Sequence, residues 1–76
     1  MNDEYVKVIF PTQRLAWVDD EKTGYTNKVF QIDTGHHKFT LGPYQNYLPE
    51  EQWFEVIGTL PNAPLTIVFT RKEDDQ

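Results

Sequence analysis

Two short polar clusters in this sequence contain the side-chain types that bind metal ions. His36 and His37 are neighbours, and imidazole is a common zinc ligand. Adjacent residues of a β-strand point to opposite faces of a sheet, so this pair cannot chelate one ion if both lie on a strand. Asp19-Asp20-Glu21 offers carboxylates to calcium, but without the alternating Asp spacing of a calcium loop. We therefore expect one exposed histidine, one near the edge of the core, a solvated acidic hairpin tip, and neither metal nor cofactor.

The tripeptide Asp33-Thr34-Gly35 matches the segment that carries the catalytic aspartate in aspartic proteases, where two carboxylates share one proton. A retroviral-type enzyme would assemble two chains around such aspartates, and Val56-Ile57-Gly58 resembles the second apolar segment of that family. However, His36 follows where a small residue is usual, and the chain is short for a flap hairpin. The segment also suits a hairpin turn, in which Asp bonds the backbone and Gly takes positive φ. We therefore expect no catalytic residue, and the dimeric aspartic protease is the alternative.

Aromatic side chains in predicted loops are the candidates for binding a partner. Such rings can form a platform for sugar rings, peptides or proteins, or they can cover the core of a small domain. The small size of the domain favours the second use. The candidate partner-binding residues are Tyr25, Tyr44, Tyr47 and Trp53.

Alternation of apolar and polar residues predicts the strands that carry these side chains. In the first predicted strand Val6, Val8 and Phe10 share one face, and Pro11 stops the pattern. Segments 19–24, 33–35, 42–49 and 60–64 have the composition of turns or loops. The predicted strands are 5–10, 14–18, 28–32, 36–41 and 65–70.

Residues 49–58 fit two kinds of element. Pro49 followed by Glu50 and Glu51 suits the start of a short helix, whereas the aromatic and β-branched residues that follow suit a strand. We favour the strand because the other elements are all β. The sequence thus predicts an all-β protein: a small antiparallel β-sandwich of about six to seven short strands, with one short helix near 49–58 as the alternative.

Composition and charge limit the partners and the location. The chain has 76 residues, no cysteine and a net charge of −5, so one domain without disulfides is expected. A negative field repels phosphate backbones and anionic lipids, and no apolar run is long enough to span a bilayer. The acidic N-terminus does not resemble a secretory signal. We expect a cytoplasmic protein, or a domain excised from a surface protein, that binds no nucleic acid and does not insert into membranes.

The order of strands and turns resembles the PEGA-like family, small β-sandwich domains of bacterial and archaeal surface proteins and lipoproteins. Trp17-Val18-Asp19-Asp20, Gly24-Tyr25-Thr26-Asn27 and Gly35-His36-His37-Lys38-Phe39 stand for three motifs of that family, and the likeness covers residues 14–41. Asp20 and Asn27 replace an expected Gly and Pro, and the Pro-Glu-Gly-Ala segment is absent. The resemblance implies one domain over residues 1–76, and the charged residues from about 71 onward are expected to form a frayed tail. It also implies a non-enzymatic binding or structural module.

A module of this kind would meet a protein or polysaccharide partner at one of two surfaces. One is the loop end with Tyr44 and Tyr47, and the other is an unpaired strand edge. The strands near 5–10 and 65–70 are the expected edges. The protein would then be a monomer, or a weak homodimer formed through a strand edge.

Overall fold

The computed structural model describes residues 3–72 and consists of strands and their connections. These residues contain no helix, so the prediction of an all-β fold is confirmed, and the strand interpretation of residues 49–58 is correct. None of them forms a helix that could cross a membrane. The strands are β1 Asp3–Ile9, β2 Leu15–Val18, β3 Glu21–Tyr25, β4 Val29–Asp33, β5 Gly35–Thr40, β6 Tyr47–Leu48, β7 Gln52–Val56, β8 Leu65–Val68 and β9 Thr70–Arg71.

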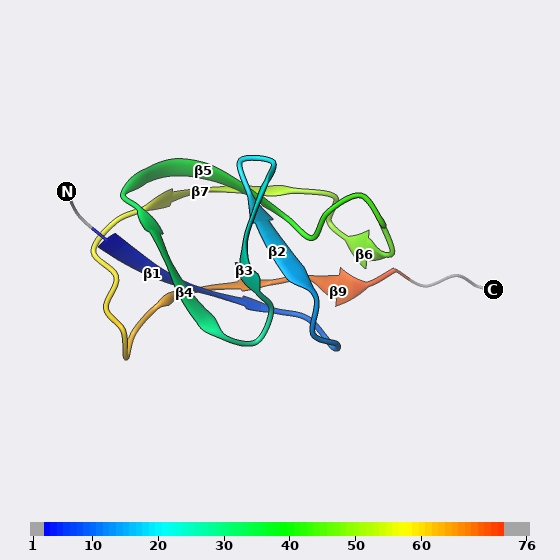
Figure 1. Cartoon of the computed structure of the whole chain (residues 1–76), viewed down its shortest axis with the longest axis horizontal. Coiled ribbons are helices and arrows are strands. Elements are labelled where there is room, and N and C mark those ends of the chain that lie inside the picture. Colours follow the sequence, from blue (N-terminus) through cyan, green and yellow to red (C-terminus); the bar gives the residue numbers. More distant parts are fainter. Residues whose placement is uncertain (1–2, 73–76) are drawn as a thin grey trace.

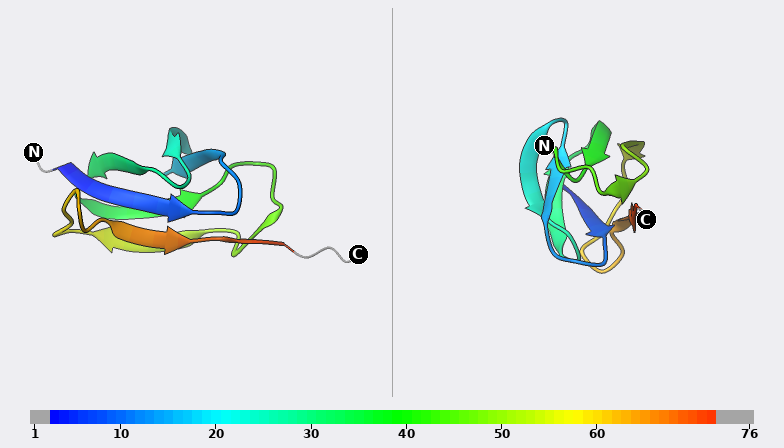
Figure 2. Two further views of the ribbon diagram at one scale, coloured as in Figure 1. Left: turned by 90° about the horizontal axis from the view of Figure 1, so that it is seen from below. Right: turned by 90° about the vertical axis from the view of Figure 1, so that its right-hand side faces the viewer.

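Two sheets form a small sandwich (Figures 1 and 2). One sheet has the order β4-β1-β8 and the other the order β3-β2-β5-β7, while β6 and β9 form a separate pair at one end. The core lies between the sheets and contains the apolar faces predicted from alternation, including Val6, Val8 and Phe10 from β1 and its end. Phe39, Ile67 and Phe69 complete it from the second half of the chain.

The strand pairing corrects two expectations. The sandwich was expected to be antiparallel, but β1 and β8 pair in parallel, with Val6 opposite Leu65. In addition, β1 was expected at an edge, but it is the central strand of its sheet because β4 pairs with its other side. The edge strands of the two larger sheets are therefore β4 and β8 in one and β3 and β7 in the other.

Two expected turns are different in the structure. The hairpin loop expected over 19–24 contains only Asp19 and Asp20, both at positive φ, and residues from Glu21 onward form β3. Two residues at positive φ are the geometry of a tight hairpin turn. The segment Asp33-Thr34-Gly35 is no hairpin turn but a crossover, because β4 and β5 belong to different sheets. Gly35 does take the positive φ that was predicted, at 137°.

The ends of the predicted loops and tail also shift. Tyr47 and Leu48, expected in a loop, form β6 and pair with β9. The frayed tail expected from residue 71 begins later, because Arg71 lies in β9 and the Lys72 N–H donates to the Asn46 carbonyl at 2.9 Å. The rest of that predicted tail, residues 73–76, lies outside the described residues.

Candidate functional site

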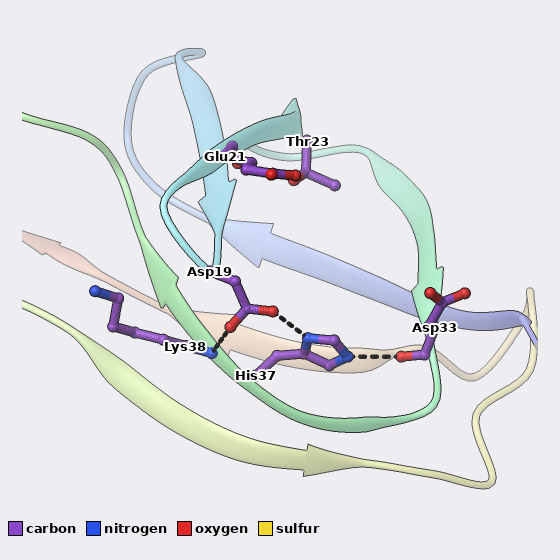
Figure 3. Close-up of polar contacts among 6 residues, drawn as sticks. All are labelled: Asp19, Glu21, Thr23, Asp33, His37 and Lys38. Atoms are coloured by element: carbon purple, nitrogen blue, oxygen red, sulfur yellow. Dashed lines mark hydrogen bonds and ion pairs between the residues drawn. The ribbon is translucent and has the colours of Figure 1, made fainter.

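Both ring nitrogens of His37 make polar contacts, and the Nε2 contact connects the two sheets (Figure 3). Its Nδ1 lies 2.6 Å from Oδ2 of Asp19, in the β2–β3 turn, and its Nε2 lies 2.8 Å from the carbonyl oxygen of Asp33, at the end of β4. The other Asp19 carboxylate oxygen accepts the Lys38 backbone N–H at 3.0 Å, which fixes the carboxylate. The predicted alternation is confirmed: the His37 side chain is 15% exposed, and His36 is exposed.

The surroundings of this bridge favour a positive imidazole beside a negative carboxylate. Burial opposes ionisation of Asp19, but hydrogen bonds from the Lys38 N–H and from His37 lower the pKa of Asp19. Burial likewise acts to lower the pKa of His37, but its hydrogen bonds to Asp19 and to the Asp33 carbonyl outweigh burial and raise that pKa. The pKa of Lys38 is raised by its hydrogen bond to Asp20, with the two charged atoms 2.8 Å apart.

An open groove of about 470 Å³ adjoins His37. It lies along the side of the sandwich where β3 and β4 are both edge strands. Its lining residues are Val18, Asp19, Glu21, Thr23, Gln31, Ile32, Asp33 and His37. Among the described residues no group of three or more His, Asp or Glu side chains is placed to hold a metal ion. A general base needs a free nitrogen to take a proton, whereas both nitrogens of His37 face oxygen acceptors.

Glu4 has a buried carboxylate on the core side of β1. It binds Thr34, the residue that follows Asp33 in the crossover between β4 and β5. The Thr34 hydroxyl donates to Glu4 Oε2 at 2.7 Å, while the Thr59 backbone N–H and hydroxyl donate to Oε1 at 2.9 and 2.6 Å. These donors, led by the Thr59 hydroxyl, lower the pKa of Glu4 to about 2 although burial opposes this. The hydroxyl of the Asp-Thr-Gly segment thus serves an internal hydrogen-bond network.

The four candidate aromatic residues are in different environments. Tyr47 is only 1% exposed: its ring packs edge-on against Phe69 at 5.5 Å between centroids, and its hydroxyl donates to the Gly42 carbonyl at 2.6 Å. The other three rings are exposed: Tyr25 by 50%, Trp53 by 63% and Tyr44 by 75%. Tyr47 therefore covers the core, which was the favoured use of these rings, and its ring is not accessible at the loop end.

The loop that carries Tyr44 is held by Arg14, which the sequence analysis did not single out. The Arg14 guanidinium donates to the carbonyls of Leu41 and Tyr44, both at 2.8 Å, and to the Asn46 side chain. It also lies over the Tyr47 ring, 5.1 Å from its centroid. Several donors in one planar group fix a loop that contains little regular hydrogen bonding of its own.

The free edge of β7 presents a defined set of backbone groups. The Lys38 carbonyl of β5 accepts an N–H from the β2–β3 turn at 2.9 Å, so it points away from β7. Backbone groups alternate along a strand, and those of His37 therefore point toward β7, where Phe54 lies opposite. On β7 the same alternation directs the N–H and C=O groups of Trp53 and Glu55 away from β5. Among the described strands, none pairs with β7 on that side.

Two apolar side chains stand out from β7 and its end. Trp53 is 63% exposed and its indole N–H donates to the Glu51 carboxylate at 2.9 Å, while Ile57 is 65% exposed. The sequence analysis named Trp53 but missed the edge itself, since alternation within one strand does not reveal which strands are its neighbours. It also missed Asp19 and His37 as a pair, because they are 18 positions apart.

Comparisons of this chain with protein-family models, with curated proteins and with solved structures find no match. The resemblance to the PEGA-like family therefore stays a prediction.

Proposed function

We propose that this protein is a non-enzymatic interaction module that binds an extended peptide segment of another protein by adding it as a strand beside β7. The observation that carries the proposal is the row of unpaired backbone groups at Trp53 and Glu55, next to the exposed side chains of Trp53 and Ile57. A free strand edge is complementary to an extended chain, because backbone hydrogen bonds supply affinity and alternate side chains supply specificity.

Charge favours a different protein over a second copy of this chain as the occupant. Each copy has a net charge of −5, and Glu51 and Glu55 lie on or beside the edge. Like charges on directly facing strands destabilise pairing, and charged residues on an edge are a common means of avoiding self-association. The preferred peptide is therefore apolar at alternate positions and neutral or basic at its ends.

The polar groups in and beside the Asp33-Thr34-Gly35 segment, which the protease alternative would use, support a non-catalytic role. His37 has both nitrogens engaged, and the Thr34 hydroxyl donates to the buried Glu4 carboxylate. A dimeric protease centred on Asp33 would place two copies of a β4 end together, where each Asp33 already lies opposite Asp3 on β1. The added negative charge makes this face a poor surface for pairing two copies.

The proposal is tested with a phage-displayed library of random linear peptides, followed by amide shift mapping with a selected peptide. We expect the largest shifts at Trp53 and Glu55, with quenching or a shift of Trp53 fluorescence. Glu55→Pro should abolish binding while the protein stays folded, since proline removes an outward N–H that β5 does not use. Glu55→Ala is the matched control and should bind.

Three results would overturn the proposal. One is a library that yields no binder while a glycan array does, which would assign the exposed rings to sugar stacking. Another is peptide binding that shifts Tyr44 and Tyr25 and leaves β7 unaffected. The third is sedimentation of the free protein as a dimer that Glu55→Pro converts to a monomer, which would identify a second copy as the occupant.

A further inference from the structure

Two consecutive residues of the β4–β5 crossover, Asp33 and Thr34, each form a hydrogen bond with a side chain from a strand. The Asp33 carbonyl is bound by His37, and the Thr34 hydroxyl is bound by Glu4. Because this crossover carries the chain from one sheet to the other, these bonds hold the sheets together at one end of the sandwich. One bond depends on a carboxylate and the other on an imidazole, so they respond to different ranges of pH.

The geometry at His37 requires two donors. Its two nitrogens lie 2.6 and 2.8 Å from a carboxylate oxygen and a carbonyl oxygen, neither of which can donate a proton. Only the imidazolium has a proton on each nitrogen; a neutral ring would direct one lone pair at an oxygen. The bridge is therefore complete in the protonated state alone.

The charged groups around His37 come from several elements, and most are acidic. Asp19 in the β2–β3 turn and Asp33 on β4 flank the ring, and Glu21 of β3 lines the same groove. Lys38, the next residue on β5, has its ammonium engaged with Asp20 of the turn. On β7 the residue opposite His37 is the uncharged Phe54. This environment stabilises the imidazolium, whereas a neutral ring finds no hydrogen-bond donor for its unprotonated nitrogen.

We propose that His37 is a proton-operated latch between the two sheets, closed while its imidazolium bridges Asp19 and the Asp33 carbonyl, and open once the ring is neutral. Deprotonation leaves one ring nitrogen without a donor, and either the Asp19 contact or the Asp33 contact breaks. When the Asp33 contact breaks, the crossover loses its bond to His37 while the Thr34 hydroxyl still donates to Glu4, so the opening is confined to the side of the groove between β3 and β4. This inference does not depend on the proposed binding of a peptide at β7.

The direction and the pH range of the latch follow from the linkage between protonation and folding. The pKa of His37 is raised in the folded state above its ordinary value of 6.5. The stabilisation of the folded protein by the His37 bridge is therefore fully present below pH 6.5, and it is lost as the pH rises through the folded-state pKa of His37. The latch thus closes toward acid and opens toward alkaline pH.

The test combines ¹⁵N NMR of the histidine rings with hydrogen exchange of the backbone amides across the His37 titration. We expect both His37 nitrogens to be protonated at about pH 5. The exchange protection of the Thr34 and Gly35 amides, corrected for the intrinsic pH dependence, should fall as His37 deprotonates, while protection at Val6 and Phe39 in the core stays constant.

The second histidine provides a matched control. His36→Gln, on the exposed side of β5, should keep the pH-dependent loss of protection. His37→Gln should remove it, and Asp19→Asn should move it to lower pH because the amide keeps an acceptor oxygen without its charge.

A neutral His37 ring at pH 5 in the folded protein would overturn the proposal. The same would follow from pH-dependent crossover protection that persists unchanged in His37→Gln, and the wild-type titration decides the question even if that variant does not fold.

Discussion

Gly24 lies in β3, where the ring of Phe30 covers its α-carbon. A methyl group at this position would lie 2.5 Å from Phe30 Cγ, closer than real side chains approach one another. Its φ is not positive, and it lies within a strand and not in the turn expected over residues 19–24. Close packing of a ring against the backbone is the reason for a glycine in the middle of a strand.

Gly24→Ala should lower the free energy of unfolding by about 1–3 kcal/mol through overpacking. Urea denaturation followed by tryptophan fluorescence measures this. A smaller residue at position 30 makes room for the methyl group, so Gly24→Ala should cost less in a Phe30→Leu background than alone. Equal costs in the two backgrounds would contradict the contact as the cause.

At the scale of residues, the sequence predicted which way side chains face better than what they contact. Alternation within the predicted strand 65–70 puts Leu65, Ile67 and Phe69 on one face; Ile67 and Phe69 are buried, and Leu65 is partly buried against the core. Glu4 continues the buried face of Val6 and Val8 on β1, but the predicted strand began at Tyr5, and a carboxylate is rarely buried without partners. Its partners come from Thr34 and Thr59, which no local pattern connects to it.

Among the elements, the loop from Leu41 to Asn46 is bound at three points by one side chain of another segment, that of Arg14. Arg14→Lys should lower the free energy of unfolding by about 1.5–3 kcal/mol, because lysine keeps the charge but not the planar set of donors. Amide spectra should then show the largest shifts at Tyr44 and Asn46. Arg71→Lys, at an exposed position, is the control, with an expected change within about 0.5 kcal/mol. Unchanged Tyr44 and Asn46 amides in Arg14→Lys would show that the loop holds itself.

The elements that could be predicted were those with a periodic signal of their own. Segments 5–10, 28–32 and 65–70 were found as strands because apolar residues alternate in them. β3 was missed because its sequence Glu-Lys-Thr-Gly-Tyr is polar and lies at an edge, where no alternation is required. The parallel pairing of β1 with β8 and the crossover at Thr34 depend on which strands become neighbours, information that the pattern within each strand does not contain.

For the whole molecule, a core of few large side chains has to stabilise a chain without disulfides. A domain of this length has a stability of roughly 4–11 kcal/mol, so single polar anchors between the sheets are a large part of the total. Two of these anchors titrate: the pKa of Glu4 is lowered to about 2, and the pKa of His37 is raised above 6.5. Glu4 binds its donors only as a carboxylate, and His37 binds its acceptors only as an imidazolium.

The pH dependence of global stability should therefore have an acid side set in part by Glu4. Its pKa of about 2 in the folded protein is below the ordinary 4.5, so the unfolded chain takes up the proton first as the pH falls. The stabilisation by the Glu4 network is complete above about pH 4.5 and is lost between pH 4.5 and about 2. Wild-type protein should be most stable between this range and the start of the His37 titration.

Glu4→Gln separates this contribution from that of the other carboxylates. The variant should be less stable than the wild type at pH 6, because an amide cannot accept from all the donors around Glu4, and the difference should shrink as the pH falls toward 2. Glu50→Gln removes the same charge at an exposed position and should follow the wild-type curve. Urea midpoints measured from pH 2 to 6 give the three curves. A constant difference between wild type and Glu4→Gln would mean that folding does not lower the pKa of Glu4, and the acid side would then belong to carboxylates elsewhere.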